Sequence, residues 1–288
     1  MRKDTGVWIM DSAAQNQAAI SRNFRAVIPP VTPDLVYYYD GTWEGWLCCV
    51  YESYMAREIP GDVLADGTGT KTAEENLFYT KVIKHDMEKS NRVRIGIADK
   101  IGRGFLRILQ LVFCSCIPHK EEEMLLFTHK GFRYGMGILN LRQDTVVKNV
   151  LKGLHELGRE IDKWYGFVRF SDVKGILVAV IGAKNNVLPF IASHFCDRYR
   201  NEKFMIFDKN HNMALLYRRG ERAIVPMEDF TLPDLSEEEK KNRVLWKSYY
   251  DAIEIKPRHN DTCRRTHMPK RYWDFLTEMT EQNSCVLK

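Results

Sequence analysis

The sequence has no long apolar run. A helix that crosses a membrane needs roughly 18 consecutive apolar residues, and no stretch of the 288 residues supplies them. An apolar patch at residues 7–10 is too short for the core of a signal peptide and is followed at once by Asp11. We therefore expect a cytoplasmic protein with no membrane partner.

The sequence also lacks the short motifs of common catalytic and metal sites. It holds no Gly-x-Ser-x-Gly elbow, no Walker loop and no dinucleotide fingerprint. The seven cysteines are an odd number, and Cys48 and Cys49 are adjacent, which favours reduced thiols over a disulfide framework. Cys114, Cys116 and His119 offer soft ligands, but no second pair stands at zinc spacing. We expect no metal site and no cofactor.

The second half of the chain alternates between helical and extended patterns. Residues 146–165 carry an apolar stripe at helical spacing, which Gly166 is expected to end. Ser236 and Glu239 form a capping box that opens a later helix. We expect that helix to turn Leu245, Tyr249, Ala252 and Ile253 inward. Between the two lie a helix at 187–200 and expected strands at 167–170, 176–181, 204–207, 214–217 and 223–227.

The summed pattern predicts an α+β fold in three parts. The fold class is a mostly antiparallel sheet packed with helices, preceded by a helical subdomain. Residues 1–34 are expected to be an appendage with a proline-rich linker, 35–145 a mostly helical subdomain, and 146–288 the α+β core with a basic C-terminal segment. In the middle part we expect strands at 36–39 and 77–84, a helix capped by Asp40 and ended by Pro60 and Gly61, a loop at 66–72, and helices at 86–101, 105–117 and 118–131.

Positive charge is concentrated near the C-terminus. Residues 256–271 hold six lysines or arginines and one acid, an excess as large as the net charge of +5 of the whole chain. Cations can neutralise phosphates and aromatic rings can stack on unpaired bases. The alternative is a solvated surface whose aromatic residues only dock the chain end. The residues predicted to bind nucleic acid here are Lys256, Arg258, Arg264, Arg265, Lys270, Arg271, Tyr272 and Trp273.

A second candidate is the glycine-rich stretch at residues 130–137. Its glycines would let backbone amides approach an anion, and Lys130 and Arg133 would supply charge. The alternative is the end of a helix followed by a turn.

A third candidate is a cluster on the expected helix at 187–200. His194, Asp197 and Arg198 lie within one helical turn, so they can reach a common point. The histidine could move a proton at neutral pH and the arginine could hold an anion. Asp208 and His211 follow and could converge on the same cleft. The alternative is a surface ion pair beside a structural histidine.

Five stretches of the chain, at residues 38–45, 130–135, 166–170, 186–199 and 268–278, match the motifs of a known family. Through them the chain resembles an uncharacterised bacterial family, a domain of unknown function associated with DNA metabolism and DNA repair. The resemblance implies a companion radical-SAM protein, and some members are fused to a domain similar to uracil-DNA glycosylases. It supplies no catalytic residues. Arg264 stands where the family pattern leads us to expect glutamine.

Three functions follow as hypotheses. The first is a nucleic-acid-binding component of a DNA repair or modification system, working with a radical-SAM partner. The second is an enzyme that acts on a nucleobase or phosphodiester through His194 and Arg198. The third is a protein-interaction scaffold without DNA affinity.

Overall fold

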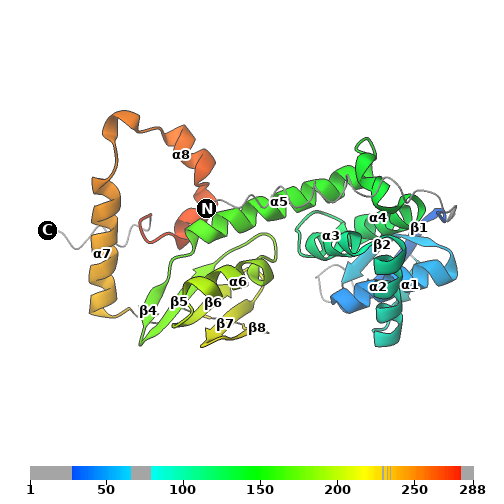
Figure 1. Cartoon of the computed structure of the whole chain (residues 1–288), viewed down its shortest axis with the longest axis horizontal. Coiled ribbons are helices and arrows are strands. Elements are labelled where there is room, and N and C mark those ends of the chain that lie inside the picture. The colour runs from blue at the N-terminus through cyan, green and yellow to red at the C-terminus, as the bar shows by residue number, and fades with distance from the viewer. Residues whose placement is uncertain (1–27, 66–78, 229, 232, 234, 280–288) are drawn as a thin grey trace. The chain divides into compact units, whose positions relative to one another are not determined.

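The computed structural model describes residues 28–279, apart from 66–78, 229, 232 and 234. The chain folds into two compact units, residues 1–155 and 156–288, and the boundary falls inside the long helix α5 (Thr145–Phe167). Helices combine with two sheets, one of them mostly antiparallel, which confirms the predicted α+β class (Figure 1). Most of the expected appendage and the loop at 66–72 lie outside the described residues.

The first unit contains a three-stranded parallel sheet. Its strands are β1 (Val31–Tyr39), β2 (Ile59–Ala65) and β3 (Tyr79–Val82), in the order β2-β1-β3. The prediction of a proline linker up to Pro33 was therefore wrong, because β1 already begins at Val31. Pro33 is tolerated where the pairing with β2 shifts register, so its missing N–H interrupts no ladder. The strand at β2 was also missed, since Pro60 and Gly61 mimic a helix terminator.

Helices surround this sheet and form the core of the first unit. They are α1 (Trp43–Ala56), α2 (Met87–Lys100), α3 (Arg103–Phe113), α4 (Lys120–Tyr134) and the 3-10 helix η2 (Gly135–Asn140). Asp86 caps α2 as predicted, whereas Thr42 rather than Asp40 caps α1. Side chains such as Trp46, Phe105 and Phe127 are fully buried in one continuous apolar cluster.

The second unit is built on a five-stranded sheet. The strands are β4 (Ser171–Val173), β5 (Ile176–Ile181), β6 (Lys203–Asp208), β7 (Met213–Arg218) and β8 (Glu221–Pro226), in sequential order. All neighbours are antiparallel except β5 and β6, which are parallel and connected by α6 (Leu188–Arg198). Figure 1 shows α6 lying across one face of this sheet.

The prediction of a strand at residues 167–170 was wrong. Helix α5 continues through Gly166 to Phe167, and the backbone N–H of Val168 still reaches the carbonyl of Trp164 at 3.3 Å. A single glycine lowers helix propensity by about 1 kcal/mol, which tertiary packing outweighs here. The ring of Trp164 is fully buried and lies 5.0 Å from the ring of Tyr272.

The last part of the chain, residues 236–279, is named here the C-terminal arm. It comprises α7 (Glu237–Ala252), η3 (Lys256–Arg258), α8 (Asp261–His267) and η4 (Lys270–Phe275). Ser236 caps α7 as predicted, with its hydroxyl oxygen accepting from the N–H of Glu239 at 3.1 Å. The prediction that one face of α7 is buried was wrong, because Leu245, Tyr249 and Ile253 are 55–67% exposed. Among the described helices, none is long and apolar enough to span a membrane.

Candidate nucleic-acid interface

The basic segment, residues 256–273, folds into the three short helices η3, α8 and η4. Asn260 begins α8, and its side-chain oxygen accepts from the N–H of Cys263 at 2.9 Å. Arg264 and Arg265 fall in the last turn of α8, where cations complement the helix dipole. The Asn260 cap therefore sets where α8 begins, and with it the positions of Arg264 and Arg265 on the helix.

Several of these cations have no acidic partner. Arg258 and Arg265 are exposed, and neither side chain forms a hydrogen bond or an ion pair with another described residue. Lys270 is also exposed, and its Nζ lies 5.8 Å from the centre of the Trp273 ring. Lys256 is in η3, but its side chain is not among those described. Arg258, Arg265 and Lys270 are thus able to neutralise phosphates.

Trp273 is held in a fixed orientation beside two cations. Its ring N–H donates to the carbonyl of Met268 at 2.9 Å, and the guanidinium of Arg264 lies 5.3 Å from the ring centre. Arg264 also donates to Asp261 at 2.7 Å, and together with Arg258 it lines a shallow, open hollow of about 380 Å³ between the end of α7 and α8. A fixed, partly exposed indole surrounded by cations is a suitable surface for stacking a base.

Arg271 is anchored to the rest of the unit. One guanidinium nitrogen lies 3.2 Å from Oε1 of Glu160, which is only 2% exposed. The same carboxylate accepts from the N–H groups of Lys184 and Asn185 at 3.1 and 2.8 Å, and from the side-chain amide of Asn185 at 2.6 Å. The Arg271–Glu160 pair therefore joins η4 to helix α5 and to the loop after β5.

Tyr272 does not present a face to a ligand. It is 1% exposed, its ring packs against Trp164 and Phe167, and its hydroxyl accepts from Arg271. The prediction that Tyr272 stacks on bases is corrected by this burial. Its ring instead docks η4 onto α5, which is the alternative that the sequence had left open for the aromatic residues.

Two further lysines lie at the edge where η4 docks. Strands β5 and β6 are parallel, and their carboxyl ends, Ile181 and Asp208, are paired neighbours. Lys209 follows β6, and its Nζ lies 4.8 Å above the ring of Phe275 in η4. Lys184 is exposed in the loop after β5. Ligands commonly bind beyond the carboxyl ends of parallel strands, a rule that could have flagged both lysines once the β5–α6–β6 unit had been predicted.

Asp208 pairs with His211 at the same edge. Asp208 is fully buried and its Oδ2 lies 2.7 Å from Nδ1 of His211, whose side chain is 27% exposed. Oδ1 of Asp208 also accepts from the N–H of Asn210 at 3.2 Å and from that of Ala183 at 3.3 Å. The carboxylate thus organises both the turn after β6 and the loop after β5.

His194, Asp197 and Arg198 lie on α6, but no hydrogen bond or ion pair among the described residues joins them. The ring of His194 lies 4.5 Å from that of Tyr165, and burial, followed by the charge of Arg198, lowers its pKa. Asp197 and Arg198 are exposed. No hydrogen bond, ion pair or ring contact among the described residues joins His194 to the Asp208–His211 pair.

The glycine-rich stretch at 130–137 belongs to the first unit and is helical rather than a loop. Residues 130–134 complete α4, and the remainder forms η2. A Cβ on Gly131 would lie 2.4 Å from the ring of Phe105, so this glycine permits close packing. Lys130 forms an ion pair with Asp144, and Arg133 lies over the ring of Tyr134 at 5.3 Å. The expected phosphate-cradling loop at these positions is corrected accordingly.

A comparison with protein families bears on the region just described. The family model for a domain of unknown function, DUF4130, matches residues 118–278, which is more than half of the chain. The chain belongs to this family. No curated protein matches it.

The DUF4130 match covers α4, α5 and nearly all of the second unit. It includes the whole basic segment and ends at Glu278, which is 2% exposed. Oε1 and Oε2 of Glu278 accept from Nη2 and Nε of Arg169 at 2.7 and 3.1 Å, and Trp246 donates to the same carboxylate at 3.0 Å. Burial alone would raise the pKa of Glu278, but these hydrogen bonds hold it below its usual value. The stretch at 38–45, which contributed to the sequence resemblance, lies outside the match.

Proposed function

We propose that this chain is a nucleic-acid-binding component of a DNA repair or DNA modification system. The observation that carries the proposal is the group of exposed cations without acidic partners, Arg258, Arg265 and Lys270, in the basic segment. The exposed Lys184 and Lys209 add two cations at the edge where η4 docks. Trp273 adds one partly exposed ring that can stack on a base.

The proposed setting is the cytosol, in company with a radical-SAM protein. Cys48 and Cys49 are buried free thiols, which fit a reducing compartment. The likeness to the DNA-metabolism family supports the partner, and the chain itself would supply the surface that holds DNA. A membrane partner is not part of the proposal.

Fluorescence anisotropy with labelled single-stranded and duplex DNA tests the proposal. The double substitution Arg258→Gln with Arg265→Gln should weaken binding by roughly tenfold or more, because hydrogen bonds to charged groups contribute about 1.5–3 kcal/mol each. Arg92→Gln with Arg94→Gln is the matched control, since both residues are exposed on α2 and the net charge falls equally. Equal losses in the two variants, or no DNA binding by the unmodified chain, would contradict the proposal.

The exposed face of α7 favours a second function, that of a scaffold for a protein partner. Leu245 is 67% exposed, Tyr249 55% and Ile253 57%, at a spacing of one helical turn. Co-purification with the radical-SAM protein should be lost in Leu245→Gln with Tyr249→Gln, while DNA binding is kept. If the Leu245→Gln, Tyr249→Gln variant still co-purified with the radical-SAM protein, α7 would have no such role.

A further inference from the structure

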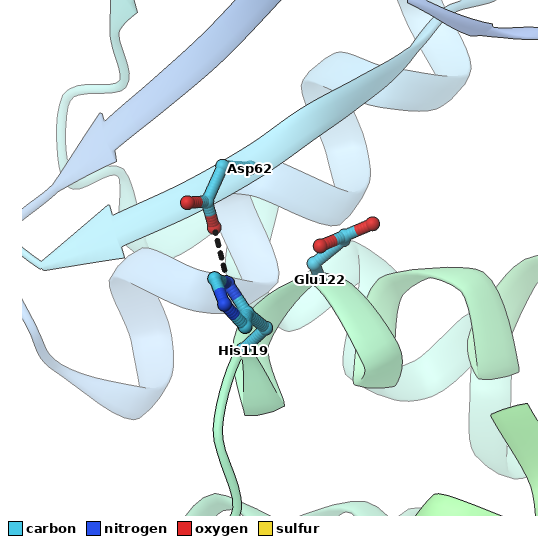
Figure 2. Close-up of side chains that lie close together, drawn as sticks. All are labelled: Asp62, His119 and Glu122. Atoms are coloured by element: carbon cyan, nitrogen blue, oxygen red, sulfur yellow. Dashed lines mark ion pairs between the residues drawn. The ribbon is translucent and has the colours of Figure 1, made fainter. Parts of the chain in front are cut away.

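Three side chains that can bind metals approach one another in the first unit. Asp62 is on β2, His119 immediately precedes α4, and Glu122 is in the first turn of α4 (Figure 2). One ligand atom from each lies within 4.8 Å of the other two, and Nδ1 of His119 is 3.6 Å from Oδ1 of Asp62. In the sequence, His119 is near only Cys114 and Cys116 as possible ligands, because Asp62 is far away in the chain.

The backbone turns His119 toward this group. Its φ of 52° is in the left-handed region, and its side chain does not cap α4 although it occupies the N-cap position. Figure 2 shows the imidazole directed at Asp62, with the Glu122 carboxylate on the neighbouring turn of helix. The imidazole is therefore available to a ligand while most of its ring remains open to solvent, at 65% side-chain exposure.

The charges around this group are unbalanced. No described lysine or arginine forms an ion pair with Asp62 or Glu122, and the carboxylate of Glu122 accepts no hydrogen bond from any described residue. Two carboxylates are thus held near each other, and among the described side chains the only cation-forming group that pairs with either is the imidazole of His119. A bound cation would satisfy both acids.

We infer that Asp62, His119 and Glu122 form a binding site for one divalent transition-metal ion. Imidazole suits zinc, iron and nickel, and carboxylates add affinity for harder ions such as Mn²⁺. Ligands bound at about 2.0–2.2 Å to a tetrahedral ion are about 3.3–3.6 Å apart, so the three ligand atoms need to approach one another by at most about 1.5 Å, through side-chain rotation. Three protein ligands would leave at least one position on the ion for water or substrate.

Calorimetric titration of the metal-free full-length chain with Zn²⁺ tests the site. We expect one ion per chain, and at least tenfold weaker binding in both His119→Asn and Glu122→Gln. Asparagine tolerates the left-handed backbone at position 119, and glutamine preserves the shape of Glu122. Unchanged Zn²⁺ affinity in the two variants would overturn the inference, as would equally tight binding of Mg²⁺.

Two controls separate this site from other zinc ligands. His85 lies 3.0 Å from Asp40 in a similar exposed pair that lacks a third ligand, so His85→Asn should leave affinity unchanged. Cys116→Ser should do the same, because thiolate is not part of the site. A loss in either control equal to that of His119→Asn would overturn the assignment.

Stability of the metal-free chain gives an independent reading. Glu122→Gln removes one of two neighbouring carboxylates, so with a chelator present the melting temperature should stay the same or rise. Added Zn²⁺ should raise the melting temperature of the unmodified chain more than that of Glu122→Gln. A lower melting temperature without metal, combined with an unchanged response to Zn²⁺, would mean that Glu122 serves the fold instead. None of these readings depends on DNA binding.

Discussion

In the first unit, Trp46, Phe105 and Phe127 are fully buried in one apolar cluster, whereas buried carboxylates attach the C-terminal arm to the rest of the second unit. Glu160 binds Arg271 and Glu278 binds Arg169, and both acids are 2% exposed. Apolar burial is not directional, whereas a buried ion pair stabilises only when its geometry is satisfied. The arm is thus positioned by these specific pairs together with the buried ring of Tyr272. Its exposed Arg258, Arg265 and Lys270 form no ion pair with another described residue and are free for a ligand.

The largest expected effect is in the apolar cluster. Trp46→Ala should lower the free energy of unfolding by about 3–5 kcal/mol, because it removes a fully buried ring and leaves a cavity. Urea unfolding followed by circular dichroism measures the change, and added salt should not alter it. Met55→Ala is the control on the same helix, since Met55 is 65% exposed and should cost little. Similar costs for the two would contradict the described packing of α1.

The second effect concerns a polar group inside that cluster. His129 is 2% exposed, its Nε2 lies 2.8 Å from Oγ of Ser53, and burial lowers its pKa from 6.5 to about 4. The unfolded chain therefore binds a proton between these values that the folded chain does not. The contribution of His129 to the free energy of unfolding is therefore complete above pH 6.5 and is lost as pH falls toward 4. At pH 4.5 the loss should be about 2–3 kcal/mol.

Urea unfolding of the unmodified chain and of His129→Gln at pH 7 and pH 4.5 tests this effect. The variant should lose less stability than the unmodified chain on acidification, because glutamine does not titrate. An equal loss in both would show that other groups cause the acid sensitivity.

The third effect is in the arm. Glu160→Gln removes the charge that faces Arg271 and one of the strong acceptors for the loop after β5. We expect a loss of about 1–3 kcal/mol, the usual cost of removing one partner of a buried polar contact. Limited proteolysis should then cut preferentially between α7 and η4. Cleavage elsewhere, with no change in stability, would show that Glu160 does not hold the arm.

The smallest effect is expected for an exposed pair in the same arm. Lys247 and Asp251 are 3.0 Å apart on α7, with side chains 34% and 58% exposed. Asp251→Asn should change stability by less than about 0.5 kcal/mol, because solvent screens such pairs. A cost as large as that of Glu160→Gln would remove the distinction between buried and exposed charge on which the comparison depends.

Local signals in the sequence predicted much of the fold. Periodic apolar stripes located α5, α6 and most strands of the second unit, and the caps at Asp86 and Ser236 were confirmed. The errors came from residues whose local meaning was overridden by tertiary contacts. Gly166 was expected to end a helix that packing extends, and Pro60 and Gly61 were expected to end a helix where β2 runs.

The candidate sites were less predictable because they depend on long-range pairing. Burial of Glu160 could have been suspected, since it lies between Leu157 and Trp164 on the apolar stripe of α5. Its partner Arg271 could not have been identified from spacing, and the same holds for Asp62 with His119. The basic segment was visible as charge density, but only the structure separates the paired Arg271 from the unpaired Arg258 and Arg265.

The salt dependence of DNA affinity tests the central claim most directly. If about four phosphates are contacted, a plot of log affinity against log salt concentration should have a slope of about −3 to −4 for the unmodified chain. The slope should become shallower by about 1.5 to 2 in the Arg258→Gln, Arg265→Gln variant, which removes two of those contacts. A slope near zero, or the same slope in both proteins, would contradict the account.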